Sequence, residues 1–169
     1  GGSFTDAGVL FEELGRGPVP GPHISSAVLA ALTMLEGATE EQKQEWLPRM
    51  ATGEVRMVAA ITEEDFGWLE SDVQVTAEQT GGRLTLNGNK AYVFDGETAT
   101  HLLCAVRSKN TNDVGLVIVP ADSAGITIRH LPGFAWNQSA IEMEDVAADS
   151  TNVLGEELAG GWAALERAQ

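Results

Sequence analysis

Acidic side chains that could carry chemistry lie next to one another in the middle of the chain. Glu63, Glu64 and Asp65 follow Thr62 directly, and carboxylates placed this closely can serve as a general acid and a general base. The same residues can form a solvated loop at the end of a strand. From the residue types alone, we favour the solvated loop.

Other reactive side chains are isolated along the chain. His23, His101 and His130 have no carboxylate or cysteine at metal-ligand spacing, so we predict no metal site. Ser25 and Ser71 have no histidine placed by the sequence to activate them, so a hydrolase triad has no support. These side chains therefore give no support for a metal site or a hydrolase.

The charge and the hydropathy of the chain exclude some partners. Ten Lys and Arg stand against 25 Asp and Glu, a net charge of -15, and such a surface repels a nucleic-acid backbone. No apolar run approaches the roughly 20 residues that span a bilayer, so we expect neither nucleic-acid binding nor membrane insertion. Residues 1–6 lack the features of a signal peptide.

Cys104 is the only cysteine and lies in the apolar run 102–106, which excludes an internal disulfide. We expect it to be a small core residue rather than a nucleophile. A reducing compartment suits such a chain, and we expect a cytoplasmic protein.

The first third of the chain has helical signals. Ser3 or Thr5 can cap a first helix, and a second helix is predicted over residues 25–35. Thr39 is predicted to cap a third helix with Gln42 at the capping-box position, and this helix should end before Gly53.

After Gly53 the hydrophobic pattern alternates, which predicts short strands. The predicted strands cover residues 55–61, 73–77, 83–86, 90–94, 101–107, 115–119, 126–130 and 140–146. Asn87-Gly88 predicts a tight turn between two of them. Strands of this length and spacing favour an antiparallel β-barrel or sandwich.

From about residue 158 the helical pattern returns. The whole order is an α+β arrangement with segregated parts. We place the helical part at residues 1–54, the β part at 55–157 and the start of a further helical part at 158–169.

Several segments together resemble the acyl-CoA dehydrogenase family. The helix leading into the family's flavin domain is similar to residues 39–54, and the family's strand that ends in Thr-Glu is similar to residues 59–63. Its Asn-Gly-x-Lys hairpin resembles residues 86–93. Further similar segments follow in the family's order at residues 125–126, 144–146 and 152–155.

The resemblance implies a known architecture and reaction. The family has an N-terminal helical domain, a middle β-domain and a C-terminal four-helix bundle, with FAD between the β-domain and the bundle and help from a neighbouring subunit. A glutamate of the bundle removes the α-proton of an acyl-CoA thioester, and a hydride passes from the β-carbon to flavin N5. Because the bundle is absent from this chain, we expect a fragment that is inactive alone.

The resemblance also assigns cofactor-binding residues. Ile61 and Thr62 would lie along the pyrimidine side of the flavin, with their backbone amides and the Thr62 hydroxyl as donors. Tyr92 stands where the family has an aromatic residue against the ring system. Ordinary strand packing is the alternative for Ile61 and Tyr92.

Departures from the family pattern fall in the same region. Gly67 is kept in the loop that approaches the pyrophosphate, but Trp68 replaces a small donor there. Phe94 stands where the family has a Thr or Ser that donates towards flavin N5, and a phenyl ring cannot donate. The family's Arg-x-Ser-like stretch is replaced by residues 134–139.

Three functional hypotheses remain open. The parent protein is a divergent acyl-CoA dehydrogenase, a non-catalytic paralogous subunit that supports an active partner in a mixed oligomer, or a flavin monooxygenase of the same fold. We favour the first, with FAD as cofactor, an acyl-CoA thioester as substrate and a homo- or hetero-oligomer as the assembly. The face that would meet the bundle should be apolar and exposed, which favours self-association.

Overall fold

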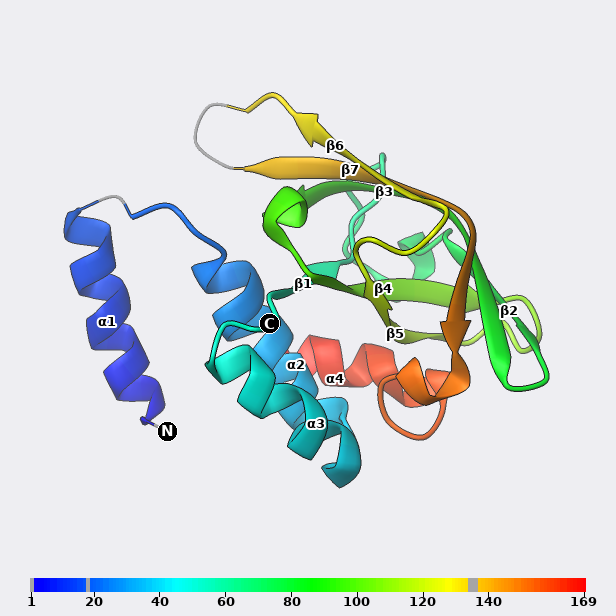
Figure 1. Cartoon of the computed structure of the whole chain (residues 1–169), viewed down its shortest axis with the longest axis horizontal. Coiled ribbons are helices and arrows are strands. Elements are labelled where there is room, and N and C mark those ends of the chain that lie inside the picture. Colours follow the sequence, from blue (N-terminus) through cyan, green and yellow to red (C-terminus); the bar gives the residue numbers. More distant parts are fainter. Residues whose placement is uncertain (1, 18, 134–136) are drawn as a thin grey trace.

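The computed structural model describes residues 2–17, 19–133 and 137–169. Helices α1 (Phe4–Arg16), α2 (Ala31–Gly37) and α3 (Glu40–Ala51) precede the sheet, and a short helix α4 (Gly161–Ala168) follows it. Figure 1 shows α2, α3 and α4 gathered on one side of a curled sheet, with α1 set apart. This confirms the α+β order of helices, sheet and a further helix.

The helix starts follow local capping signals. Ser3, rather than Thr5, caps α1, and its side chain exchanges hydrogen bonds with Asp6. Thr39 caps α3, and Gln42 completes the predicted capping box. Each box satisfies amide groups that the first helical turn leaves without partners.

The second predicted helix has an unexpected first half. Residues His23–Ala30 form a π-helix, η1, which continues directly into α2. Ser25 and Ser26 of η1 are buried, and η1 packs on β1. π-Helical turns are rare and occur frequently at functional sites, and their local sequence signal is too weak to separate them from an α-helix.

The sheet contains seven strands, which are β1 (Met57–Ala60), β2 (Thr76–Thr80), β3 (Arg83–Phe94), β4 (His101–Ser108), β5 (Val114–Pro120), β6 (Ile126–Leu131) and β7 (Gln138–Asp149). The order is β1-β4-β2-β3-β7-β6, and β5 pairs with β4. Most pairs are antiparallel as expected, but β1 and β2 each pair with β4 in parallel. The sheet is therefore mixed and curls strongly, as Figure 1 shows.

The predicted turn at Asn87-Gly88 is wrong. Both residues lie inside β3, which runs unbroken from Arg83 to Phe94. Gly88 takes a φ of +134°, and a Cβ there would meet Val75 at 3.0 Å. The glycine thus allows an irregular backbone conformation within β3, at the point where the pairing with β7 shifts register.

Two apolar clusters form the core on the two faces of the sheet. The cluster beneath the helices includes Met34, Trp46 and Trp162, and the cluster enclosed by the sheet includes Leu86 and Ile141. Strand β4 supplies alternate residues to each cluster, which explains its continuous apolar sequence.

Cys104 belongs to the enclosed cluster and is fully buried. Burial raises the pKa of its thiol to about 12. A thiol with this pKa is not a nucleophile at neutral pH, so the interpretation of Cys104 as a core residue is confirmed.

Residues after β7 lead back to the helical side. Short 3-10 helices at Ser150–Asn152 and Leu158–Gly160 precede α4, and two others lie at Glu70–Asp72 and Gly96–Thr98, the latter labelled η3. No four-helix bundle occurs among the described residues. None of the described helices combines the length and apolarity needed to cross a membrane.

Candidate functional site

The segment that leaves β1 meets the middle of β3, and we call this place the β1–β3 junction (residues 61–63 and 90–92). The Thr62 hydroxyl donates to the Ala91 carbonyl at 2.6 Å, and the Ala91 amide donates to the Thr62 carbonyl at 2.9 Å. These reciprocal bonds join segments far apart in sequence. They hold the end of β1 against β3, although these two strands share no ladder.

A buried ion pair lies beneath the same junction. Lys90 Nζ is 2.8 Å from Glu63 Oε1 and donates to the Ile61 carbonyl at 3.0 Å. The Glu63 carboxylate also accepts from the backbone amides of Gln74 and Val75. Burial lowers the pKa of Lys90, and the neighbouring Glu63 carboxylate opposes that shift.

The interpretation of the acidic segment as a solvated loop is therefore wrong for Glu63. Glu64 and Asp65 are exposed as expected, but Glu63 is buried because Lys90 and two amides satisfy its oxygens. Sequence reasoning gave Lys90 no role. The spacing of Lys90 could have indicated its burial, because the two-residue period of a strand places it on the same face of β3 as Leu84 and Leu86.

The backbone amides of Ile61 and Thr62 lie directly after β1. Ile61 and Thr62 are each 4% exposed, and β1 pairs on one side only. Among the described residues, none accepts a hydrogen bond from either amide. Buried amides normally have a partner, so unpaired ones at a strand end mark a candidate binding site.

Tyr92 occupies a strained position in β3. Between Lys90 and Val93 this strand carries one residue more than β7, and Tyr92 has a φ of 57°. Its ring lies 4.4 Å from that of Phe66, which has a φ of 63°. Left-handed conformations of bulky residues cost about 1–3 kcal/mol each and cluster at functional sites.

The loop after Glu63 explains why Gly67 must be glycine. A Cβ at this position would lie 2.3 Å from Oδ2 of Asp72 and 2.4 Å from its Cβ. Asp72 is held in place because its carboxylate accepts from the Leu69 amide and the Ser71 hydroxyl. In the same loop Phe66, Trp68 and Leu69 are 53%, 42% and 67% exposed.

Phe94 ends β3 beside the N-terminal helices. It is half-buried and pairs with Gln138 of β7. The next residue, Asp95, has a φ of 59° and accepts a hydrogen bond from the Ser25 hydroxyl of η1 at 2.7 Å. Of the stretch 134–139, residues 134–136 lie outside the described residues, whereas Ser139 is buried opposite Val93.

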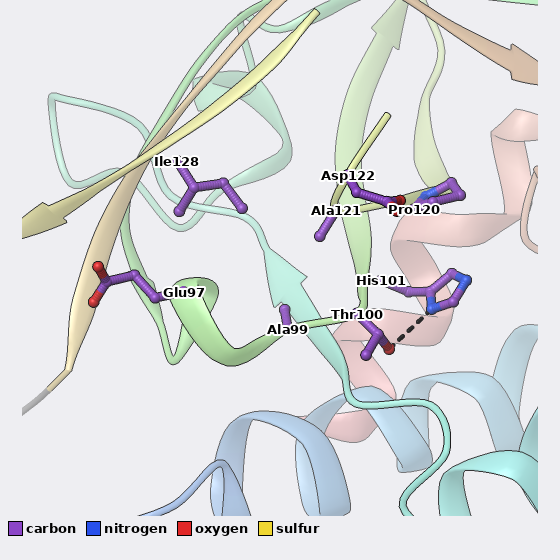
Figure 2. A pocket seen from close by; sticks show the side chains of 8 residues that line it. All are labelled: Glu97, Ala99, Thr100, His101, Pro120, Ala121, Asp122 and Ile128. Atoms are coloured by element: carbon purple, nitrogen blue, oxygen red, sulfur yellow. Dashed lines mark hydrogen bonds between the residues drawn. The ribbon is translucent and has the colours of Figure 1, made fainter. Parts of the chain in front are cut away.

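A separate hollow of about 520 Å³ lies between η3, the start of β4 and the connection from β5 to β6 (Figure 2). It is lined by Glu97, Ala99, Thr100, His101, Pro120, Ala121, Asp122 and Ile128. None of the residues predicted to bind the cofactor lines it. Among the described residues, no group of His, Cys, Asp and Glu could hold a metal ion.

Two family models match the chain. The model of the acyl-CoA dehydrogenase N-terminal domain matches residues 1–54, and that of the acyl-CoA dehydrogenase middle domain matches residues 58–146. The chain belongs to the acyl-CoA dehydrogenase family. The β1–β3 junction lies entirely within the middle-domain match.

Individual relatives agree with the family models. The probable acyl-CoA dehydrogenase YngJ of Bacillus subtilis (strain 168) is 29% identical over 170 residues, covering 95% of this chain and 45% of YngJ. The acyl-CoA dehydrogenase from Geobacillus kaustophilus has the same fold, with a TM-score of 0.87 and 26% identity, covering 99% of this chain and 46% of that one.

Two further solved members carry information on cofactor and assembly. A glutaryl-CoA dehydrogenase from Mycobacterium smegmatis in complex with FADH2 is 26% identical, with a TM-score of 0.73, over 83% of this chain and 36% of that one. The ChsE4-ChsE5 complex from Mycobacterium tuberculosis is also 26% identical, with a TM-score of 0.80, over 94% and 43%. This acyl-CoA dehydrogenase family chain spans less than half the length of these relatives.

Proposed function

We propose that the β1–β3 junction is part of an FAD site and that the whole protein desaturates an acyl-CoA thioester between its α and β carbons. The observation that carries the proposal is that the buried amides of Ile61 and Thr62 have no partner within the described residues, at the junction that also contains Tyr92. Flavin offers hydrogen-bond acceptors along its pyrimidine edge and a flat ring system beside them. The junction offers the matching groups, which are amide donors and an aromatic ring.

FAD, when bound, would accept the hydride that leaves the β-carbon of the acyl-CoA thioester. The residues of this chain would bind and orient it. The Ile61 and Thr62 amides would donate to the pyrimidine edge, and Tyr92 would pack against the ring system. The Thr62 hydroxyl was expected to be a further donor to the flavin. In the structure it donates a hydrogen bond to the Ala91 carbonyl instead. We assign it the task of holding the junction together.

Gly67 and Phe94 have more limited parts in the proposed site. Gly67 keeps the loop close to Asp72 and so sets the path of residues 64–70 beside Tyr92. Phe94 would shape the site by packing alone, since its ring has no donor. Both assignments extend the family resemblance to these positions.

The 169-residue chain should not turn over substrate alone. The proton-abstracting glutamate of the family belongs to the C-terminal bundle, and no residue here is assigned its role. We propose that the whole protein works in the cytoplasm as a homo- or hetero-oligomer. An acyl-CoA dehydrogenase assay with an artificial electron acceptor should show no turnover by this chain, and clear turnover would contradict that expectation.

One observation favours a second candidate function. Trp68 and Phe94 stand where the family has small donors, and the Thr62 hydroxyl is engaged by Ala91. A site with fewer donors suits a non-catalytic subunit that supports an active partner. The ChsE4-ChsE5 complex, an assembly of relatives, is consistent with this alternative.

The test is a titration of the purified chain with FAD, followed by flavin fluorescence. We expect saturable binding in the micromolar range, and loss of binding in Tyr92→Gly. Glycine accepts the left-handed conformation at position 92, so the variant removes the ring without straining the strand. Asn112→Gly, at another residue with positive φ (69°), is the matched control and should bind as wild type does.

The outcomes separate the two candidate functions. Binding that depends on Tyr92 supports a working flavin site. Binding that survives in Tyr92→Gly contradicts the assignment of this residue. If the chain alone binds no FAD, the full-length protein is titrated in the same way, and failure there favours the non-catalytic subunit.

A further inference from the structure

The buried ammonium of Lys90 makes a second contact besides its ion pair. Its side chain is 0% exposed, and it contacts two acceptors, the Glu63 carboxylate and the Ile61 carbonyl. A buried ion pair is weak evidence for stability, because desolvation of both charges opposes their attraction. An apolar pair of similar size could fill the same volume, but the Gln74 and Val75 amides and the Ile61 carbonyl would lose these partners. The contact with Ile61 offers a reason for a cation here.

The geometry of a peptide bond links that contact to the candidate site. The Ile61 carbonyl and the Thr62 amide belong to one planar, trans peptide unit, in which C=O and N–H point in opposite directions. By holding the carbonyl at 3.0 Å, Lys90 turns the Thr62 amide away from itself. Ala91 holds the next carbonyl, that of Thr62, in a similar way.

The charge of Lys90 adds to this orientation. A cation at the carbonyl oxygen polarises the whole peptide unit, which makes its N–H a stronger donor. The Glu63 carboxylate cancels only part of this effect, because it also accepts hydrogen bonds from the amides of Gln74 and Val75. The Thr62 amide is therefore an oriented and polarised donor without a partner among the described residues.

We infer that Lys90 is a positioning residue for the flavin, acting through the Ile61–Thr62 peptide unit to aim a strengthened amide at an acceptor atom of the pyrimidine ring. This inference rests on the proposed function. Lys90 does not touch the ligand in this arrangement. Its removal should weaken flavin binding while the fold persists.

The main variant must remove both charges together, so that neither is left unpaired in the core. The double variant Lys90→Met/Glu63→Gln replaces both charges with side chains of similar length. Glu63→Gln alone keeps the ammonium on the Ile61 carbonyl. Lys109→Met is the control, since Lys109 also pairs with a glutamate, Glu78, but at the surface.

The first readout needs no ligand. In NMR spectra of the isotope-labelled chain, the Ile61 carbonyl and Thr62 amide resonances should move together in the double variant and stay in place in Lys109→Met. In Glu63→Gln the resonances of Gln74 and Val75 should move more than those of Ile61 and Thr62. Unchanged Ile61 and Thr62 resonances in the double variant would overturn the inference.

The second readout is FAD affinity. The double variant should bind about tenfold more weakly than wild type, which corresponds to the loss of one good hydrogen bond. Glu63→Gln and Lys109→Met should stay close to wild type. Wild-type affinity in a double variant whose Ile61 and Thr62 resonances have moved would also overturn the inference.

The two readouts distinguish failure of this inference from failure of the proposed function. If the wild-type chain binds no FAD, affinity is compared in the full-length protein, where failure to bind contradicts the proposed flavin site, and the NMR comparison still decides whether Lys90 orients the Thr62 amide. If the double variant does not fold, Lys90→Gln/Glu63→Gln replaces it. That variant keeps an N–H donor without the charge, and unchanged resonances and affinity there would reject the role of the cation.

Discussion

At the scale of single residues, the polar groups of Thr62 have different surroundings at the β1–β3 junction. The Thr62 hydroxyl and carbonyl are both bound to Ala91, whereas the Thr62 amide is unpaired within the described part of the chain. A residue type alone therefore does not tell which of its polar groups faces a ligand.

Thr62→Val should destabilise the chain. Valine has nearly the same shape but cannot donate, so the buried Ala91 carbonyl loses this hydrogen bond at a cost of about 1–2 kcal/mol. Urea denaturation measures the free energy of unfolding. Thr127→Val, at an exposed position of β6, is the control, and an equal loss there would contradict the special role of Thr62.

Gly67→Ala should also destabilise, by about 1–3 kcal/mol, because the new Cβ would overlap the Asp72 side chain and force the loop to move. Gly82→Ala is the matched control. Its Cβ would have only the Ser150 hydroxyl nearby, at 3.8 Å. Thermal unfolding of both variants checks the expectation, and equal midpoints would show that the loop adapts freely.

At the scale of elements, a single glutamine connects α3 to the end of the β part. The Gln42 amide nitrogen donates to the carbonyls of Thr151 and Val153, and its oxygen accepts from the amides of Thr39 and Gly155. The residue predicted as a local capping partner is thus also a long-range connection.

Gln42→Ala should lower the free energy of unfolding by about 2 kcal/mol, because the variant removes a cap and leaves backbone groups without partners. The nearby Gln44 is exposed on the same helix, and Gln44→Ala should change stability by a few tenths of a kcal/mol at most. Equal effects in chemical denaturation would assign the loss to helix propensity rather than to this connection.

His101 joins α3 to β4 and should make this contact sensitive to pH. Its ring lies 5.0 Å from that of Trp46, and burial, followed by the charge of Arg49, lowers its pKa. A lowered folded-state pKa means that the unfolded chain binds more protons below about pH 6.5. Stability should therefore fall as the pH drops from 7 through the folded-state pKa.

His101→Gln provides the comparison, since glutamine does not titrate. The difference in unfolding free energy between wild type and this variant should shrink as the pH falls from 7 to 5. A difference that stays constant over this range would show that protonation of His101 is not linked to folding.

At the scale of the whole molecule, exposed apolar side chains favour self-association, whereas the large net charge disfavours it. Phe66, Trp68 and Leu69 lie on one loop, while the net charge of -15 repels other copies. At 0.1 M, salt largely screens such repulsion between charges more than about 10 Å apart. The balance should therefore favour association when salt is added.

Sedimentation velocity should show self-association that grows with protein concentration and with salt. Trp68→Ser/Leu69→Ser should reduce it, because these side chains would supply much of the apolar contact. A clean monomer at high concentration and high salt would contradict this expectation.

Much of the fold was predictable from the sequence. The helix starts at Ser3 and Thr39 follow from capping residues within four positions, and most strands follow from the alternation of apolar residues. The turn predicted at Asn87-Gly88 was wrong because the same dipeptide suits both a turn and an irregular strand. The boundaries 1–54, 55–157 and 158–169 and the five cofactor contacts stay predictions.

The sequence by itself determined the order of elements, the buried state of Cys104 and the family, because capping, periodicity and short motifs are local properties of the chain. Only the tertiary structure decided that β1 and β2 share β4 in parallel, that Glu63 is buried by Lys90, and that two amides at the end of β1 lack partners within the described residues. The Lys90–Glu63 contact joins positions 27 residues apart. Such contacts depend on how the sheet curls, and that curl results from the packing of all strands together.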